Sequence, residues 1–268
     1  MPFCTLPSSS HGGGNLYYEE YGTGQPLLLV PGLNGLASFW AAQLQVFAAG
    51  FRVITFDHRG AGQSTHSLIR YSIEQMADDT LALMDHLKLE RVHYVGHSTG
   101  GTIGQRLAAR TPDRIGNLVL SATWPRADAY FKRAFALRKA VLETQGVRAY
   151  TQLGALSLYP PDYFAANFAA LEDRAERSLA TRPPAAILAS RVDAIVEFDG
   201  WDALPGISQR TLVVCARDDM ITPLYFSEQL AARLPHASLA LLERGGHFCP
   251  VSEPADYNRV VLGFLRGS

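Results

Sequence analysis

Three residues that could together break an acyl bond, Ser98, Asp219 and His247, each follow an apolar run of the chain. Ser98 lies in VGHSTGG, Asp219 in ARDDMITP and His247 in ERGGHFCP. An imidazole that takes the proton of a serine hydroxyl makes it a nucleophile, and a carboxylate orients the imidazole and stabilises its protonated form. The chain order Ser, Asp, His is one of the arrangements that this triad adopts. These residues predict nucleophilic attack on a carbonyl carbon.

The serine lies in a turn crowded by glycines, which is the local structure that such a nucleophile needs. Gly96, Gly100 and Gly101 leave room where a strand turns sharply into a helix. The turn exposes the Ser98 hydroxyl beside the N-terminus of that helix, where the helix dipole favours developing negative charge. A serine that only fills a tight turn gives the same short motif. The matching positions of the other two residues favour the nucleophile.

Other residues compete for the roles of acid and base. Asp218 could be the acid or a loop carboxylate, and the resemblance described below favours Asp219, which stands four residues before Pro223 as in the D-x-x-x-P pattern of that family. Among the eight histidines, His58 and His97 lie inside turn motifs, so we expect them to be structural, with His97 also a pocket candidate. The sequence therefore predicts His247 as the base, and it predicts no metal site.

Short apolar runs alternate with helical patterns on both sides of a long helical stretch. Continuous apolar strands separated by helices are typical of a parallel sheet with both faces covered. Each of the three functional residues follows the carboxyl end of a predicted strand, where such sheets place their sites. The predicted strands cover residues 26–32, 51–57, 91–96, 114–122, 210–219 and 238–246, and the predicted helices cover 71–89 (with Ser72 as N-cap), 99–111, 223–234 and the chain after 254.

The alternation stops between residues 124 and 205, where the pattern is helical and shows no convincing strand. Such a stretch is too long for an ordinary loop. Its many aromatic side chains either form a core between helices and sheet or, in part, roof a pocket above Ser98. The candidates for lining that pocket are Asn34, His97, Trp124, Tyr130, Tyr159 and Phe248.

The first part of this stretch carries an excess of cationic side chains. A solvated helix face explains such an excess most simply. Attraction of a substrate that bears a carboxylate is the second explanation. The cationic residues are Arg126, Lys132, Arg133, Arg138, Lys139 and Arg148, against Asp128 and Glu143.

The composition fits one well-buried globular domain with an insertion. The chain of 268 residues is 47% hydrophobic and 18% charged, and its formal net charge of −1 offers no basic excess for nucleic acid. Three cysteines without C-x-x-C spacing indicate neither a disulfide framework nor a zinc site. The N-terminal stretch lacks the pattern of a signal peptide, and no apolar run could span a bilayer. We expect a cytoplasmic protein without a membrane partner, and the oligomeric state is not predicted.

Taken together, the motifs VPGLNG, DHRGAGQS, GHSTGG, DDMITP and GGHFCP resemble those of the α/β-hydrolase fold family over nearly the whole chain. The resemblance implies an α/β fold, with a mostly parallel sheet, helices on both faces and a helical cap insertion. The core would comprise residues 1–123 and 206–268, and the cap residues 124–205. Ser98 would be the nucleophile, Asp219 the acid and His247 the base. The backbone N–H groups of Leu33 and Thr99 would form the oxyanion hole, and no cofactor would be required.

Within this family the chain looks most like the aminoacrylate (carbamate) hydrolases of uracil degradation, on the stretches YSIEQMA, LYPPDYFAAN and GGHFCPVSEPADYN. It is next most similar to 3-oxoadipate enol-lactonases and small esterases. The resemblance implies a cofactor-free serine hydrolase that cleaves a small ester, lactone or related acyl substrate. Two alternatives stay open at this point: a ligand-binding receptor that keeps the fold without turnover, and a perhydrolase or haloperoxidase-like activity with the same triad.

Overall fold

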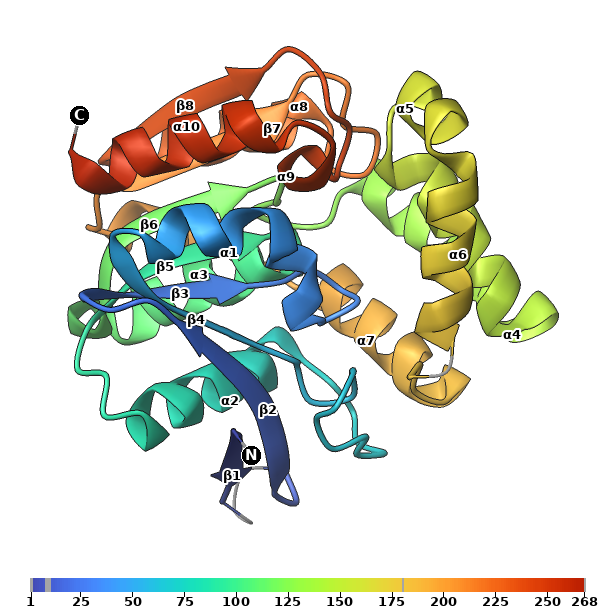
Figure 1. Cartoon of the computed structure of the whole chain (residues 1–268), viewed down its shortest axis with the longest axis horizontal. Coiled ribbons are helices and arrows are strands. Elements are labelled where there is room, and N and C mark those ends of the chain that lie inside the picture. Colours follow the sequence, from blue (N-terminus) through green and yellow to red (C-terminus); the bar gives the residue numbers. More distant parts are fainter. Residues whose placement is uncertain (1, 8–10, 180, 268) are drawn as a thin grey trace.

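One sheet runs through the molecule (Figure 1), of which the computed structural model describes residues 2–7, 11–179 and 181–267. Within these residues the sheet has eight strands in the order β1-β2-β4-β3-β5-β6-β7-β8. Strands β3 to β8 pair in parallel, whereas β1 and β2 pair antiparallel at one edge. The strands are β1 (Phe3–Leu6), β2 (Gly14–Tyr21), β3 (Gln25–Val30), β4 (Phe51–Phe56), β5 (Val92–His97), β6 (Ile115–Ser121), β7 (Thr211–Ala216) and β8 (Ala237–Leu242).

Helices cover both faces of the sheet because successive strand residues point to opposite sides. In β3, for example, Leu27 and Leu29 belong to one buried cluster, and Leu28 and Val30 belong to the other. The first cluster includes residues of α1 (Ala41–Ala48) and α10 (Pro254–Arg266), and the second those of α2 (Ile73–His86), α3 (Thr99–Arg110) and α8 (Leu224–Arg233). The predicted fold class, a mostly parallel sheet between two layers of helices, is confirmed.

The order of the strands creates a crevice at the end of β3. From β3 the chain passes to β4 on one side, and it later returns to β5 on the other side. Loops that leave neighbouring strands in opposite directions separate at such a switch point, and open α/β sheets place their ligands there. The turn that contains Ser98 follows β5, and the loop that contains Leu33 follows β3. The topology thus brings these two segments to one edge of the sheet.

In the described part of the segment between β6 and β7, four helices lie together beside the sheet (Figure 1). They are α4 (Ala129–Leu158), α5 (Pro161–Ala166), α6 (Phe168–Leu179) and α7 (Ala185–Glu197), and they are followed by a 3₁₀ segment, Trp201–Gly206. Gly146 interrupts α4 with a left-handed φ of 83°. Phe131 of α4 and Ile187 of α7 share a buried cluster with sheet residues, so these helices pack onto the sheet.

The two ends of this helical insertion lie next to each other. Arg126 and Asp199 form an isolated antiparallel bridge, and the Gly200 N–H donates to the Pro125 carbonyl at 2.8 Å. An insertion whose ends meet can be added between two strands without disturbing the sheet. We keep residues 124–205 as our proposal for the cap and use that name for them below.

The sequence patterns missed several short elements. Strands β1 and β2, helix α1 and the single turn α9 (Cys249–Ser252) were not predicted, because β1 has only four residues and β2, GNLYYEEY, has little apolar alternation. The predicted N-cap of α2 is correct, since the Ser72 side chain accepts a hydrogen bond from the Gln75 N–H. In the part of the chain that the structure describes, every helix is too short or too polar to cross a membrane.

The close contact of α3 with the sheet depends on glycine. A Cβ atom added at Gly100 would collide with the Val30 carbonyl oxygen of the central strand, which cannot move without disturbing the sheet. We expect Gly100→Ala to lower the free energy of unfolding by about 2 kcal/mol or more. The matched control is Gly206→Ala, because a Cβ there would meet no atom within 4 Å. Urea titration of both variants tests this, and equal stabilities would show that the glycine is not required.

Candidate active site

The Ser98 backbone adopts a strained conformation between β5 and α3. Its φ of 54° and ψ of −116° lie in a region that L-residues rarely occupy. Hydrogen bonds hold it there: the Ser98 N–H donates to the Ser121 carbonyl at 2.8 Å, and the Thr123 hydroxyl donates to the Ser98 carbonyl at 2.8 Å. The strain lifts the side chain out of the strand and presents its hydroxyl at the N-terminus of α3.

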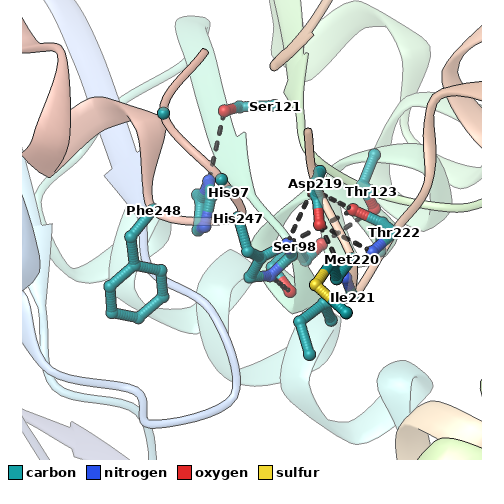
Figure 2. Close-up of polar contacts among 12 residues, drawn as sticks. His97, Ser98, Ser121, Thr123, Asp219, Met220, Ile221, Thr222, His247 and Phe248 are labelled. Carbon is teal, nitrogen blue, oxygen red and sulfur yellow. Dashed lines mark hydrogen bonds and ion pairs between the residues drawn. The ribbon is translucent and has the colours of Figure 1, made fainter. Parts of the chain in front are cut away.

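The structure brings the three predicted residues into one hydrogen-bonded row (Figure 2). His247 Nε2 lies 3.0 Å from Ser98 Oγ, and His247 Nδ1 lies 2.9 Å from Asp219 Oδ2. All three side chains are almost completely buried. The residues come from the carboxyl ends of β5, β7 and β8, so the parallel sheet is what assembles them.

Asp219 is held on both carboxylate oxygens. Its Oδ1 accepts the backbone N–H groups of Ile221 and Thr222, and its Oδ2 accepts the Thr222 hydroxyl at 2.7 Å. An ionised carboxylate only accepts hydrogen bonds, so His247 must carry its proton on Nδ1 and present the lone pair of Nε2 to Ser98. This tautomer suits a base that takes the proton of the serine.

Asp218 binds the backbone of the loop before His247 rather than the His247 ring. Its carboxylate accepts the backbone N–H groups of Gly246 at 2.9 Å and of Gly245 at 3.3 Å. It therefore holds the loop that carries His247. The geometry favours Asp219 as the partner of the imidazole and gives Asp218 the role of a loop carboxylate.

The two predicted oxyanion-hole residues flank Ser98. Leu33 lines the same cavity as Ser98, and Thr99 is the first residue of α3. Among the described residues, neither the Leu33 nor the Thr99 backbone N–H has a hydrogen-bond partner. Two free N–H groups beside the nucleophile are what a negatively charged oxygen would require.

A buried arginine of the cap holds the loop that contains Leu33. Arg191 of α7 donates to the Leu33 carbonyl from Nε at 3.2 Å and from Nη2 at 2.8 Å, and its Nη1 donates to the Arg59 carbonyl at 2.7 Å. Its side chain is 1% exposed. Sequence reasoning missed this residue, because no local motif marks an arginine that binds backbone carbonyls far away in the chain.

A cavity of about 130 Å³ lies between the sheet edge and the cap. Ser98 and His247 line it from the sheet side, together with apolar side chains such as Phe39 and Leu158. Among the described residues, His, Cys, Asp and Glu side chains form no group of three that could hold a metal ion. The largely apolar wall suits a small organic substrate.

Comparisons with known proteins agree with this architecture. The model of the alpha/beta hydrolase fold family matches residues 25–254. The chain belongs to this family. The predicted family resemblance and the expected class of enzyme, a hydrolase, are thereby confirmed.

Three known proteins resemble this hydrolase over nearly its whole length. A protein of Azorhizobium caulinodans, provisionally named carbamate hydrolase RutD, is 37% identical over 259 residues, which is 97% of this chain and 98% of that protein. The enol-lactonase from Burkholderia xenovorans has a TM-score of 0.90 at 27% identity and covers 99% of this chain and 100% of its own. A thermophilic esterase from Thermogutta terrifontis has a TM-score of 0.87 at 28% identity, with 100% of this chain and 98% of its own covered.

The cavity of the hydrolase contains three of the six predicted pocket residues. Asn34, Tyr159 and Phe248 line it. Trp124 and Tyr130 do not, and the prediction for them was wrong. Trp124 is 1% exposed and packs on Phe131 in the core, whereas Tyr130 is 46% exposed and its hydroxyl donates to the Met220 carbonyl.

His97 also lies outside the cavity wall, so its assignment as a lining residue was wrong. Its ring is fully buried, stacks on Phe39 with centroids 4.7 Å apart, and lies 5.0 Å from the His247 ring. Its Nδ1 is 3.1 Å from the Ser121 hydroxyl. His97 therefore packs against the His247 ring.

Burial holds the pKa of His97 well below its usual value, and the neighbouring His247 acts in the same direction. As the pH falls below about 6.5, the unfolded chain takes up a proton that the folded protein refuses, so stability falls by up to about 1.4 kcal/mol per pH unit. Above that pH the imidazole is neutral in both states and contributes nothing. We expect His97→Gln to have a correspondingly shallower loss of stability between pH 6.5 and 5.5.

Urea unfolding of both proteins at pH 7.5, 6.5 and 5.5 measures this difference. His58, which burial also keeps neutral by lowering its pKa, is present in both proteins and cancels in the comparison. Parallel pH profiles would mean that His97 accepts a proton in the folded state.

Proposed function

We propose that this hydrolase cleaves a small acyl substrate, such as an ester, a lactone or a carbamate-type compound, through an acyl-enzyme on Ser98. The observation that carries the proposal is the continuous row of hydrogen bonds from Ser98 through His247 to Asp219 at the wall of a cavity. A serine in a tight turn needs no such row. A serine that must lose its proton does.

In the first half of the reaction, Ser98 Oγ attacks the substrate carbonyl while its proton passes to His247 Nε2. The carbonyl electron pair moves to the oxygen, and the N–H groups of Leu33 and Thr99 stabilise that negative charge. Asp219 stabilises the imidazolium. When the carbonyl forms again, the bond to the leaving group breaks, and that group takes the proton from His247.

In the second half, water replaces the leaving group. His247 takes a proton from the water as its oxygen attacks the acyl carbon, and the same two N–H groups stabilise the second oxyanion. Collapse breaks the bond to Ser98, which regains its proton from His247. The product is a free acid, and the enzyme returns to its starting state. These steps use only the named groups and water.

Two observations support this range of substrates. The relatives carry the names carbamate hydrolase, enol-lactonase and esterase, which all describe cleavage of a bond to an acyl carbon. A cavity of about 130 Å³ with an apolar wall favours a small substrate over a polymer or a long-chain lipid. The shared chemistry is attack on a small, accessible carbonyl group.

Removal of the nucleophile tests the proposal. We expect Ser98→Ala to reduce kcat on a short-chain p-nitrophenyl ester by about four to six orders of magnitude with an unchanged unfolding midpoint. A fluorophosphonate probe should label the wild-type protein at Ser98 and leave the variant unlabelled. Unchanged turnover in the variant would refute the mechanism, and a wild-type protein that neither labels nor hydrolyses any ester would favour a ligand-binding receptor.

The two adjacent aspartates provide a matched pair for the role of the acid. Asp219→Asn should lower kcat by about four orders of magnitude, because an amide no longer stabilises the imidazolium or selects the tautomer. Asp218→Asn keeps an acceptor for the loop and should cost less than tenfold, a rough bound that follows from its lack of contact with His247. The reverse order of effects would assign the acid to Asp218.

The contact of Arg191 with the Leu33 carbonyl leads to a further expectation. Arg191→Met should lower kcat on the same ester by about tenfold or more with little change in KM, because the loop that bears one oxyanion donor loses its support. Arg191→Lys keeps one donor and should recover part of the loss. A rise in KM at constant kcat would instead place Arg191 in ground-state binding.

A further inference from the structure

Three arginines of the cap line the cavity that contains the nucleophile. Arg138 comes from α4, Arg174 from α6, and Arg182 from the segment before α7. Ser98 and His247 line the same cavity. Among the described residues, no aspartate or glutamate contributes to its wall. One part of the cavity wall is thus cationic, whereas most of the remaining wall is apolar.

These guanidinium groups have no anionic partner. In the part of the chain that the structure describes, none of the three forms an ion pair. The Nε atoms of Arg138 and Arg182 are buried and have no hydrogen-bond partner. Arg138 lies over the rings of Phe135 and Tyr150, at 5.0 Å and 5.3 Å from their centroids. Donors with these surroundings are available to a ligand.

Other cationic residues of the cap behave differently. Arg148 pairs with Glu176, Arg177 with Asp173, and Lys139 with Asp193. None of these three cations lines the cavity. The cap therefore provides carboxylates for several of its outward-facing charges and none for those that face the substrate.

The electrostatic cost of this arrangement supports a ligand. Burial lowers the pKa of the Arg182 guanidinium, and the nearby charge of Arg138 also lowers it. Two like charges at the wall of a partly desolvated cavity repel each other more strongly than they would in water. A bound anion would remove both the repulsion and the unsatisfied donors. Planar guanidinium groups match a carboxylate in geometry, with two parallel N–H···O bonds.

Arg182 also connects the cationic wall to the reacting centre. Its Nη1 donates to the Asn34 side-chain oxygen at 3.0 Å, and Asn34 follows Leu33 directly in the chain. A carboxylate held by Arg182 therefore lies close to the loop that would hold the oxyanion. A spacer of a few carbon atoms between the carboxylate and the scissile carbonyl fits this arrangement.

We propose that Arg138, Arg174 and Arg182 bind a carboxylate of the substrate, so that the preferred substrate is a short acyl compound that carries a negative charge. This inference rests on the proposed function and specifies its substrate class. Arg182, with its buried Nε and its contact to Asn34, is the principal ligand. Arg174, whose side chain is exposed, is the residue that an incoming anion meets first.

Two esters of equal length test the proposal. Monoethyl succinate ends in a carboxylate where ethyl pentanoate ends in a methyl group. The wild-type enzyme should have a kcat/KM at least tenfold higher for the succinate ester. Arg182→Gln should lower that value by about 10- to 100-fold, the range expected for a charged hydrogen bond, and should lower the value for the pentanoate ester by only about fivefold or less, because only the contact with Asn34 is lost there.

The control variant is Arg148→Gln, which removes a cap arginine that is paired and lies outside the cavity wall. This variant should have the same kcat/KM as the wild-type enzyme for both esters. Hydrolysis of both esters with equal kcat/KM by the wild-type enzyme, or equal losses on both in Arg182→Gln, would overturn the inference while the serine mechanism stands.

A binding measurement separates this inference from the reaction itself. Isothermal titration of the Ser98→Ala protein with succinate should show binding, and Arg174→Gln and Arg182→Gln introduced into that protein should each weaken it at least tenfold. Succinate binding by a protein that hydrolyses no ester would support the inference and refute the proposed function. Inorganic phosphate that binds as tightly as succinate would overturn the assignment to a carboxylate.

Discussion

The hydrogen bond between Asp219 and His247 Nδ1 is the interaction on which the rest of the site depends. It selects the tautomer that offers Nε2 to Ser98 at 3.0 Å, and so it decides whether the serine hydroxyl meets a base or a second donor. The bond is reliable because the carboxylate is itself immobilised by Thr222 and Ile221. The sheet provides the positions around this bond, because β5, β7 and β8 are parallel and end at the same edge of the sheet. The three side chains follow these strand ends closely in the chain.

The backbone strain at Ser98 also serves to position a side chain of the site. A serine in an ordinary strand-to-helix connection would point along the sheet, whereas the left-handed φ turns its hydroxyl toward the imidazole. Gly96 and Gly100 allow this conformation, because a Cβ atom at either position would collide with neighbouring backbone. The hydrogen bonds of the Ser98 backbone with Ser121 and Thr123 hold it. The groups that hold Ser98 in this conformation all belong to the core, so the conformation does not depend on the cap.

How much the sequence could predict follows from where each signal lies in the chain. The apolar strands, the glycine turn and the Ser, Asp, His order are local patterns, and all of the predicted parallel strands are present in the sheet. The failures were of another kind. An aromatic side chain looks the same in the sequence whether it packs in the core, as Trp124 does, or lies exposed, as Tyr130 does. Arg191 acts through partners that only the fold brings near, so composition and spacing give no sign of it.

Among its contacts with the core, the cap touches two consecutive residues of the loop after β3, and this loop belongs both to the proposed oxyanion hole and to the proposed substrate site. Arg191 holds the Leu33 carbonyl, and Arg182 holds the Asn34 side chain. A carboxylate that draws Arg182 toward itself must therefore act on the loop that contains the Leu33 N–H, because the two contacts are one residue apart. The proposed nucleophile, Ser98, has a position that the parallel sheet fixes, whereas the proposed oxyanion donor, the Leu33 N–H, lies in a loop that the cap contacts. Under the proposed function, the sheet would position the groups that break the bond, and these two arginines of the cap would influence which substrate binds beside them.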